Sequence, residues 1–142
     1  MIVLPDTSVW SLALRRRQSA DLSKDERQLT AKLAEAIQDG RVAMIGPIRQ
    51  ELLSGLRDRG QFEKLRNALH AYSDEPLETV DYEEAARFHN ACRSRGVECG
   101  PVDILICAIV ARRKWQILAN DDGLARCWEI IRGLQVTHEK TT

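Results

Sequence analysis

Short runs of β-forming residues alternate with helical patterns along the whole chain. The β-like runs cover residues 1–4, 41–45, 77–80, 116–119 and 134–137, and helical patterns fill the gaps between them. Such alternation favours a mostly parallel sheet with helices on both faces, joined by right-handed crossovers. The sequence therefore predicts an α/β fold of three layers, in which a central five-stranded, mostly parallel sheet is flanked by helices.

Length and composition favour one folded domain. The chain has 142 residues, enough for a single compact core, and neither a repeat nor a low-complexity tract interrupts it. Only the polar tail over residues 139–142 is expected to fray. We therefore expect a single domain over residues 1–138. Within it, Pro5 should lie at the very end of the first strand, because proline has no N–H to donate to a neighbouring strand.

Charge and hydropathy limit the functional classes. The 21 basic and 21 acidic residues cancel, which removes the overall cationic field typical of nucleic-acid-binding proteins. Any contact with phosphate must then be local or metal-mediated. The longest apolar run, residues 104–111, is far shorter than the roughly 20 residues needed to span a bilayer. The opening apolar run is too short for a secretory leader, so the sequence predicts a cytoplasmic protein with no membrane span.

The four cysteines contain no C-x-x-C pair. Without an export signal they are expected to stay reduced, so a disulfide framework is not predicted. His89 and Cys92 are three residues apart on a predicted helix, with Cys99 beyond, but a fourth zinc ligand is not evident. The apolar stripe of that helix instead places His89 at the edge of the core.

Apolar spacing predicts the main helices. Residues 25–39 carry one apolar stripe and end at Gly40, and residues 82–93 carry a second stripe. Residues 104–111 are apolar on every side, as expected of a helix buried against the sheet. A further helix over residues 47–56 has Glu51 at the border of its buried face. Gly55, one turn later, leaves open space beside that glutamate.

Four carboxylates occupy positions from which this fold could bring them to one edge of the sheet: Asp6, Glu51, Asp103 and Asp121. Asp6 and Asp121 follow predicted strands, and ligands of open parallel sheets bind beyond the carboxyl ends of the strands. Asp103 lies in the first turn of a helix that starts near Pro101. If these acids converge, their mutual repulsion requires a cation. Oxygen ligands without paired histidines or thiolates favour Mg²⁺ or Mn²⁺ over zinc.

Each acid also has a purely structural interpretation. Asp6 and Asp121 could be N-caps that accept backbone N–H groups. Asp103 could simply stabilise the positive end of its helix, and Glu51 could be a solvated residue at the rim of the buried face. The sequence leaves both interpretations open for each residue taken alone.

Four segments in order resemble the motifs of one family: LPDTSVW (4–10), QELLSGL (50–56), GPVDILI (100–106) and ILAND (117–121). They are similar to the motifs of PIN-domain ribonucleases, and especially to those of VapC-type toxins of toxin–antitoxin pairs. The resemblance implies a PIN-like nuclease domain, Mg²⁺- or Mn²⁺-dependent cleavage of RNA, homodimerisation and neutralisation by a small cognate antitoxin. Carried over position by position, it makes Asp6, Glu51, Asp103 and Asp121 the catalytic, metal-binding quartet.

The last motif departs from the family pattern. Ala119 stands where the family usually has Ser or Thr, Gly123 where it has an acid, and Leu124 where it has an aromatic residue. Asp122 is therefore an auxiliary candidate that could share the role of the fourth acid. Ser8 is a second auxiliary candidate, expected to orient a water or a carboxylate, because no histidine is placed to activate it as a nucleophile.

Three basic clusters are candidates for contact with the RNA backbone: Arg15 with Arg16 and Arg17, Arg57 with Arg59, and Arg112 with Arg113 and Lys114. The first cluster is preferred because it lies one helix away from Asp6. The alternative for each cluster is a solvated helix end.

Two other functional classes compete with the nuclease. A catalytically weak or silent PIN-like binding module would explain the departures at Ala119 and Gly123. A phosphoacceptor domain also has acids at strand ends. It would need paired acids after the first strand and an acceptor aspartate after the third, where the chain offers only Asp6 and Asp81.

Overall fold

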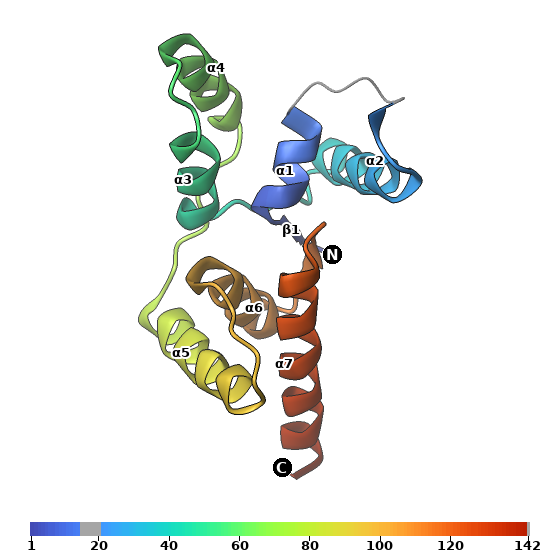
Figure 1. The fold of residues 1–142 in the computed structure, drawn as a ribbon, viewed down its shortest axis with the longest axis vertical. Coiled ribbons are helices and arrows are strands. Elements are labelled where there is room, and N and C mark those ends of the chain that lie inside the picture. The colour runs from blue at the N-terminus through green and yellow to red at the C-terminus, as the bar shows by residue number, and fades with distance from the viewer. Residues whose placement is uncertain (15–20, 142) are drawn as a thin grey trace. The chain divides into compact units, whose positions relative to one another are not determined.

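The structure is a computed structural model that describes residues 1–14 and 21–141, with side chains described as far as residue 134. Its elements are, in chain order, β1 (Val3–Pro5), α1 (Thr7–Leu14), α2 (Lys24–Gln38), α3 (Gly46–Ser54), α4 (Arg59–Leu69), α5 (Thr79–Ser94), α6 (Pro101–Arg113), β2 (Gln116–Leu118) and α7 (Asp122–Thr141) (Figure 1). The chain divides into two compact units. The first contains Met1–Pro76 and Leu118–Asn120, and the second contains Leu77–Ile117 and the chain from Asp121 onward.

The sheet is smaller than predicted. β1 and β2 form a two-stranded sheet, in which the Asp6 N–H donates to the Leu118 carbonyl at 2.9 Å. The predicted strand over residues 41–45 contributes isolated parallel bridges from Val42 to Val3 and from Met44 to Asp74. The α/β class is therefore confirmed, while the five-stranded sheet is not found among the described residues. Pro5 ends β1, as expected.

Two predicted strands are wrong because helices form there instead. Residues 79–80 begin α5, whose start is fixed by a capping box in which the Glu78 N–H donates to Asp81 Oδ2 at 2.8 Å. Residues 134–137 continue α7. The buried residues Leu124, Cys127 and Ile131 already follow a helical spacing there, so the short apolar run at its end was too brief to indicate a strand.

The first unit is built from α1, α2, α3, α4 and β1. α1 packs against both α2 and α3, and α3 packs against α4. α2 begins at a capping box of Ser23 and Glu26 and is followed by Gly40 in the left-handed region, at φ +66°. The predicted stripe of α2 is only partly buried: Leu33 is in the core, whereas Ile37 is 38% exposed.

In the second unit α5, α6 and α7 lie side by side (Figure 1). The residues of α6 from Ile104 to Val110 are all buried, which confirms the prediction of a helix that is apolar on every side. The expectation of reduced cysteines is wrong for one pair, because Cys99 and Cys127 form a disulfide. No helix in the described ranges is long and apolar enough to cross a membrane.

A buried ion-pair network joins α5 to the end of α6. Asp81 is fully buried, and its carboxylate lies 3.1 Å from Arg112 Nη1 and 3.0 Å from Arg113 Nη2. Burial by itself would raise the pKa of Asp81, but the hydrogen bond from Glu78 N–H and the two guanidinium groups outweigh burial and lower it. The carboxylate therefore stays charged inside the unit.

We predict that Asp81→Asn lowers the free energy of unfolding by on the order of 3 kcal/mol, because it removes the buried carboxylate that pairs with Arg112 and Arg113. Urea unfolding at neutral pH measures this loss. The matched change Glu63→Gln removes an exposed pair with Arg66 at 3.3 Å and should cost less than about 1 kcal/mol. Because the folded-state pKa of Asp81 is lowered, the stability that its ionised carboxylate contributes is present above about pH 4 and is lost as the pH falls further. An equal loss from both variants would contradict the assigned role.

Candidate functional site

Asp6 is buried at the junction between β1 and α1, with only 3% of its surface exposed. Its Oδ1 accepts hydrogen bonds from the Ser8 hydroxyl at 2.5 Å and from the Val9 N–H at 3.2 Å. Its main-chain carbonyl accepts the N–H groups of Val9 and Trp10. Asp6 therefore acts as the cap of α1, and its carboxylate is held in a fixed orientation.

Ser8 connects this carboxylate to the chain that follows β2. Its hydroxyl donates to Asp6 and accepts a hydrogen bond from the backbone N–H of Asn120 at 2.9 Å. The Ser8 hydroxyl thus serves as a donor to the carboxylate and as an acceptor for the Asn120 N–H. This arrangement suits a residue that orients a carboxylate.

Glu51 reaches the same neighbourhood from α3. Its carboxylate is exposed, and its Oε1 accepts a hydrogen bond from the Thr7 hydroxyl at 2.8 Å. Since Thr7 directly follows Asp6, the bond links α3 to the residue next to Asp6. Thr7 was not among the sequence-based candidates. Its place in the first turn of a helix gave no signal of a partner 44 residues away.

A cavity of about 720 Å³ opens beside Glu51, between α1, α3 and α4. A Cβ on Gly55 would meet nothing within 4 Å, so space is open beside this glycine. The wall of the cavity also carries Ser11 and the ammonium-bearing Lys64. A cavity of this size, apolar with a few polar groups, is suited to binding part of a ligand.

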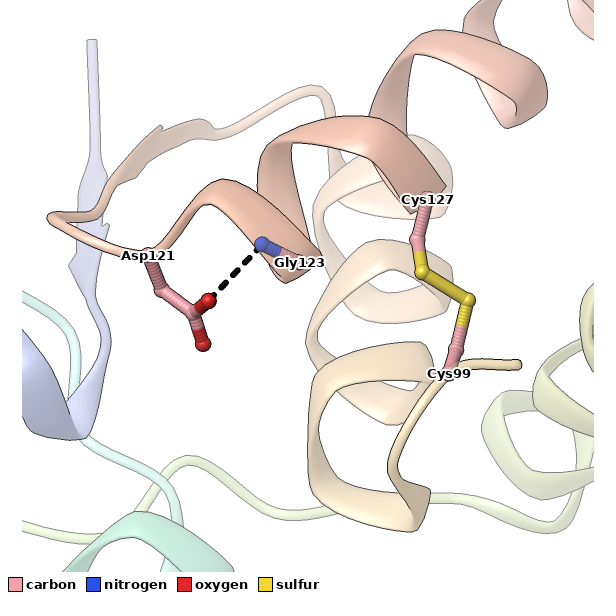
Figure 2. Close-up of a disulfide and its surroundings, with 4 residues drawn as sticks. All are labelled: Cys99, Asp121, Gly123 and Cys127. Carbon is pink, nitrogen blue, oxygen red and sulfur yellow. Dashed lines mark hydrogen bonds between the residues drawn. A yellow bond between two sulfur atoms is a disulfide. The ribbon is translucent and has the colours of Figure 1, made fainter. Parts of the chain in front are cut away.

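The second unit holds the other acids at the starts of two helices. Asp103 is half-buried in the first turn of α6, and its Oδ2 lies 3.7 Å from the position that a Cβ on Gly100 would take. Asp121 precedes α7, and its Oδ1 accepts the Gly123 N–H at 2.8 Å (Figure 2). Asp122, the first residue of α7, is exposed.

The cap interpretation is therefore confirmed for Asp6 and Asp121. A carboxylate that caps a helix can still accept further bonds, because its two oxygens offer about four lone-pair sites. The same bonds fix the direction in which the remaining lone pairs point. A carboxylate held in this way suits metal coordination better than a freely rotating one, because ligands are normally oriented by their own hydrogen-bond partners.

Gly123 gives a physical reason for one departure from the family pattern. A Cβ at this position would lie 3.2 Å from Asp121 Oδ1, tighter than ordinary contact. Glycine therefore leaves room for Asp121 to accept the backbone N–H at residue 123. Leu124, at the position where the family has an aromatic residue, is fully buried.

The basic clusters differ in their outcomes. Arg15, Arg16 and Arg17 lie outside the described residues. In the third cluster, Arg112 and Arg113 bind the buried Asp81, and Arg113 also lies over the Trp115 ring at 5.3 Å, so both side chains have a structural role.

The phosphoacceptor alternative is contradicted, since Asp81 is fully buried and lies in the first turn of α5.

The family follows from the comparison with known proteins. Residues 3–127 match the PIN domain, so the chain belongs to the PIN-domain family, whose members are generally metal-dependent nucleases. The fold is similar to that in the crystal structure of FitAcB from Neisseria gonorrhoeae, with a TM-score of 0.70 at 17% sequence identity. The likeness covers 90% of this chain and 94% of that chain. No curated protein matches.

We predict that Ser8→Ala destabilises the first unit by about 1 kcal/mol, because it removes the hydrogen bonds to Asp6 and from Asn120. The backbone amide of Asn120 should also lose protection in hydrogen exchange measured by NMR. Ser11→Ala, on the same helix, is the matched control and should leave that amide protected. Unchanged protection of Asn120 in Ser8→Ala would show that the contact does not form in solution.

Proposed function

We propose that this protein is a Mg²⁺- or Mn²⁺-dependent endoribonuclease that acts as the toxin of a toxin–antitoxin pair. The observation that carries the proposal is the fixed Asp6 carboxylate, oriented by Ser8 and accompanied by Glu51 through Thr7, in a chain of the PIN-domain family. A carboxylate whose orientation is fixed by its hydrogen bonds is suited to holding a cation.

The donor set of the first unit fits a hard divalent ion. It consists of the carboxylates of Asp6 and Glu51 and the hydroxyls of Thr7 and Ser8. Mg²⁺ and Mn²⁺ prefer carboxylate, hydroxyl and water oxygens, whereas zinc prefers histidine and thiolate. We further propose that Asp103 and Asp121 of the second unit are ligands of the same centre, with Asp122 in an auxiliary role.

Each residue then has a defined task. The four acids hold the ion, while Ser8 fixes the rotamer of Asp6 and Thr7 fixes that of Glu51. A bound divalent ion supplies the Lewis acid that activates water and neutralises charge on the scissile phosphate. Orientation by neighbouring hydroxyls lowers the reorganisation that the carboxylates must undergo during the reaction.

Contact with RNA must be local, because the chain has no net charge. We propose that the cavity between α1, α3 and α4 receives part of the strand, with Lys64 in its wall close to a phosphate. Arg15, Arg16 and Arg17 remain a proposed second contact. We also propose that residues 1–138 act as one nuclease domain, that the protein is a cytoplasmic homodimer, and that a small antitoxin neutralises it.

We predict that Asp6→Asn and Asp103→Asn each abolish Mn²⁺ binding and reduce RNA cleavage by at least about 100-fold, because each removes a charged ligand. Calorimetric titration measures the binding, and cleavage of labelled RNA measures the activity. Induced expression should arrest growth only for the wild type. Asp25→Asn, an exposed acid in the first turn of α2, is the matched control and should behave as the wild type.

The results separate the nuclease from its rival. If the wild type binds no Mn²⁺ and cuts no RNA, the protein is a silent PIN-like module, in agreement with the departures at Ala119 and Gly123. If Asp103→Asn arrests growth as strongly as the wild type, the catalytic assignment is wrong. Mapping the cut RNAs then identifies the sequence that the enzyme prefers.

We predict that Lys64→Ala weakens RNA binding about threefold to tenfold, because one phosphate contact is lost. The slope of log affinity against log salt concentration should become shallower by about one. Fluorescence anisotropy at several salt concentrations, with Asp103→Asn present to prevent cleavage, measures both quantities. Lys32→Ala, an exposed lysine on α2, is the control. Equal losses from the two variants would contradict a specific contact at Lys64.

A further inference from the structure

Three buried cysteines gather in the second unit. They are Cys92 on α5, Cys99 just before α6 and Cys127 on α7, and their Sγ atoms all lie within 4.8 Å of one another. Cys99 and Cys127 form a disulfide between residues 28 positions apart, with a Cα–Cα distance of 6.3 Å. Cys92 is free and has no exposed surface. A free thiol therefore lies beside an existing disulfide.

The disulfide joins the starts of the two helices that carry acids. Cys99 precedes Gly100, the N-cap of α6, and Asp103 follows within the first turn of that helix. Cys127 lies early in α7, and Figure 2 shows it about one turn after Gly123, with Asp121 just before the helix. A covalent bond at this place restricts how far α7 can move from the start of α6. It therefore restricts the two acids as well.

We propose that the Cys99–Cys127 disulfide is a reversible redox link that controls the metal affinity of Asp103 and Asp121, with Cys92 as its exchange partner. This inference rests on the proposed metal-dependent function. The oxidised form holds the two acids in position for the ion. Reduction or exchange removes the link and weakens binding.

The exchange step is balanced without an external oxidant. The Cys92 thiolate attacks Cys99 Sγ, the Cys92–Cys99 bond forms as the Cys99–Cys127 bond breaks, and the proton lost by Cys92 is taken up by Cys127. The new bond joins α5 to the loop that follows it and leaves α7 without a cross-link. Burial raises the pKa of Cys92, which slows this step at neutral pH.

Full reduction needs two electrons and two protons, and a dithiol of the cytoplasmic kind is the reductant that we propose. The dithiol gives two electrons and two protons, so Cys99 and Cys127 become thiols and the dithiol becomes a cyclic disulfide. Reductants of this class maintain thiols in the cytoplasm, where the disulfides of mesophilic proteins are usually redox-sensing or catalytic. The proposed cytoplasmic location thus favours a reversible role for this bond over a permanent structural one.

The test compares oxidised and reduced protein. Intact wild-type protein is divided, one portion is reduced with dithiothreitol, and the reductant is removed under argon before Mn²⁺ titration by calorimetry. We expect the affinity of the reduced form to be about 10-fold lower, at the lower end of the losses that follow removal of residues that orient metal ligands. Circular dichroism of both portions shows whether the fold is kept. Reoxidation should restore the affinity.

Thiol mapping tests the exchange partner. After incubation at alkaline pH and alkylation, peptide mass spectrometry of the wild type should find the Cys92–Cys99 pair beside Cys99–Cys127. Cys92→Ala should keep only Cys99–Cys127 and keep the redox dependence of Mn²⁺ binding. Failure to find the Cys92–Cys99 pair in the wild type would overturn the exchange role of Cys92.

The other outcomes are distinct. Equal Mn²⁺ affinity in the oxidised and reduced forms overturns the redox link and leaves the proposed nuclease intact. Binding in neither form contradicts both proposals. Purified protein in which all four cysteines are reduced and Cys92, Cys99 and Cys127 hold one zinc ion per chain would make the cluster a metal site, and would overturn the redox link.

Discussion

The hydrogen-bonded carboxylate of Asp6 is the point on which the first unit depends. It directly follows β1, caps α1 and, through Ser8, connects to the backbone after β2. An apolar residue at this position would remove the side-chain acceptor of the Val9 N–H and of the Ser8 hydroxyl. The same bonds fix where its oxygens point. Stability and site geometry are therefore set by one side chain.

This arrangement removes the apparent conflict between capping and metal binding. The cap bond stops the carboxylate from rotating while leaving it lone pairs that can bind a cation. Asp121 at the start of α7 is held by the same kind of bond. An acid that caps a helix at the carboxyl end of a strand is thus suited to both roles.

The helices were predictable from the sequence because their apolar spacing was long enough to define a period. Residues 104–111 were recognised as a fully buried helix, and Pro101 opens α6 as expected. The strands were less predictable, since three residues of β1 or β2 are too few to show an alternation. The error at residues 79–80 arose where the capping box of Glu78 and Asp81 outweighs a local β preference. The pattern of apolar residues alone did not reveal the hydrogen bond between the Glu78 N–H and the Asp81 carboxylate.

Contacts between distant residues set the limit for predicting the site. Asp6, Asp103 and Asp121 could be named because each follows a strand or opens a helix, and Glu51 because it borders the buried face of its helix. Nothing in the spacing linked Thr7 to Glu51, or Cys99 to Cys127. Arg112 and Arg113 resembled a free basic cluster until the buried Asp81 accounted for both guanidinium groups. Both arginines therefore have a structural role in the second unit, which the sequence alone could not show. A metal ion held by acids would attract phosphate locally, and would do so without a basic cleft in a chain whose charges cancel.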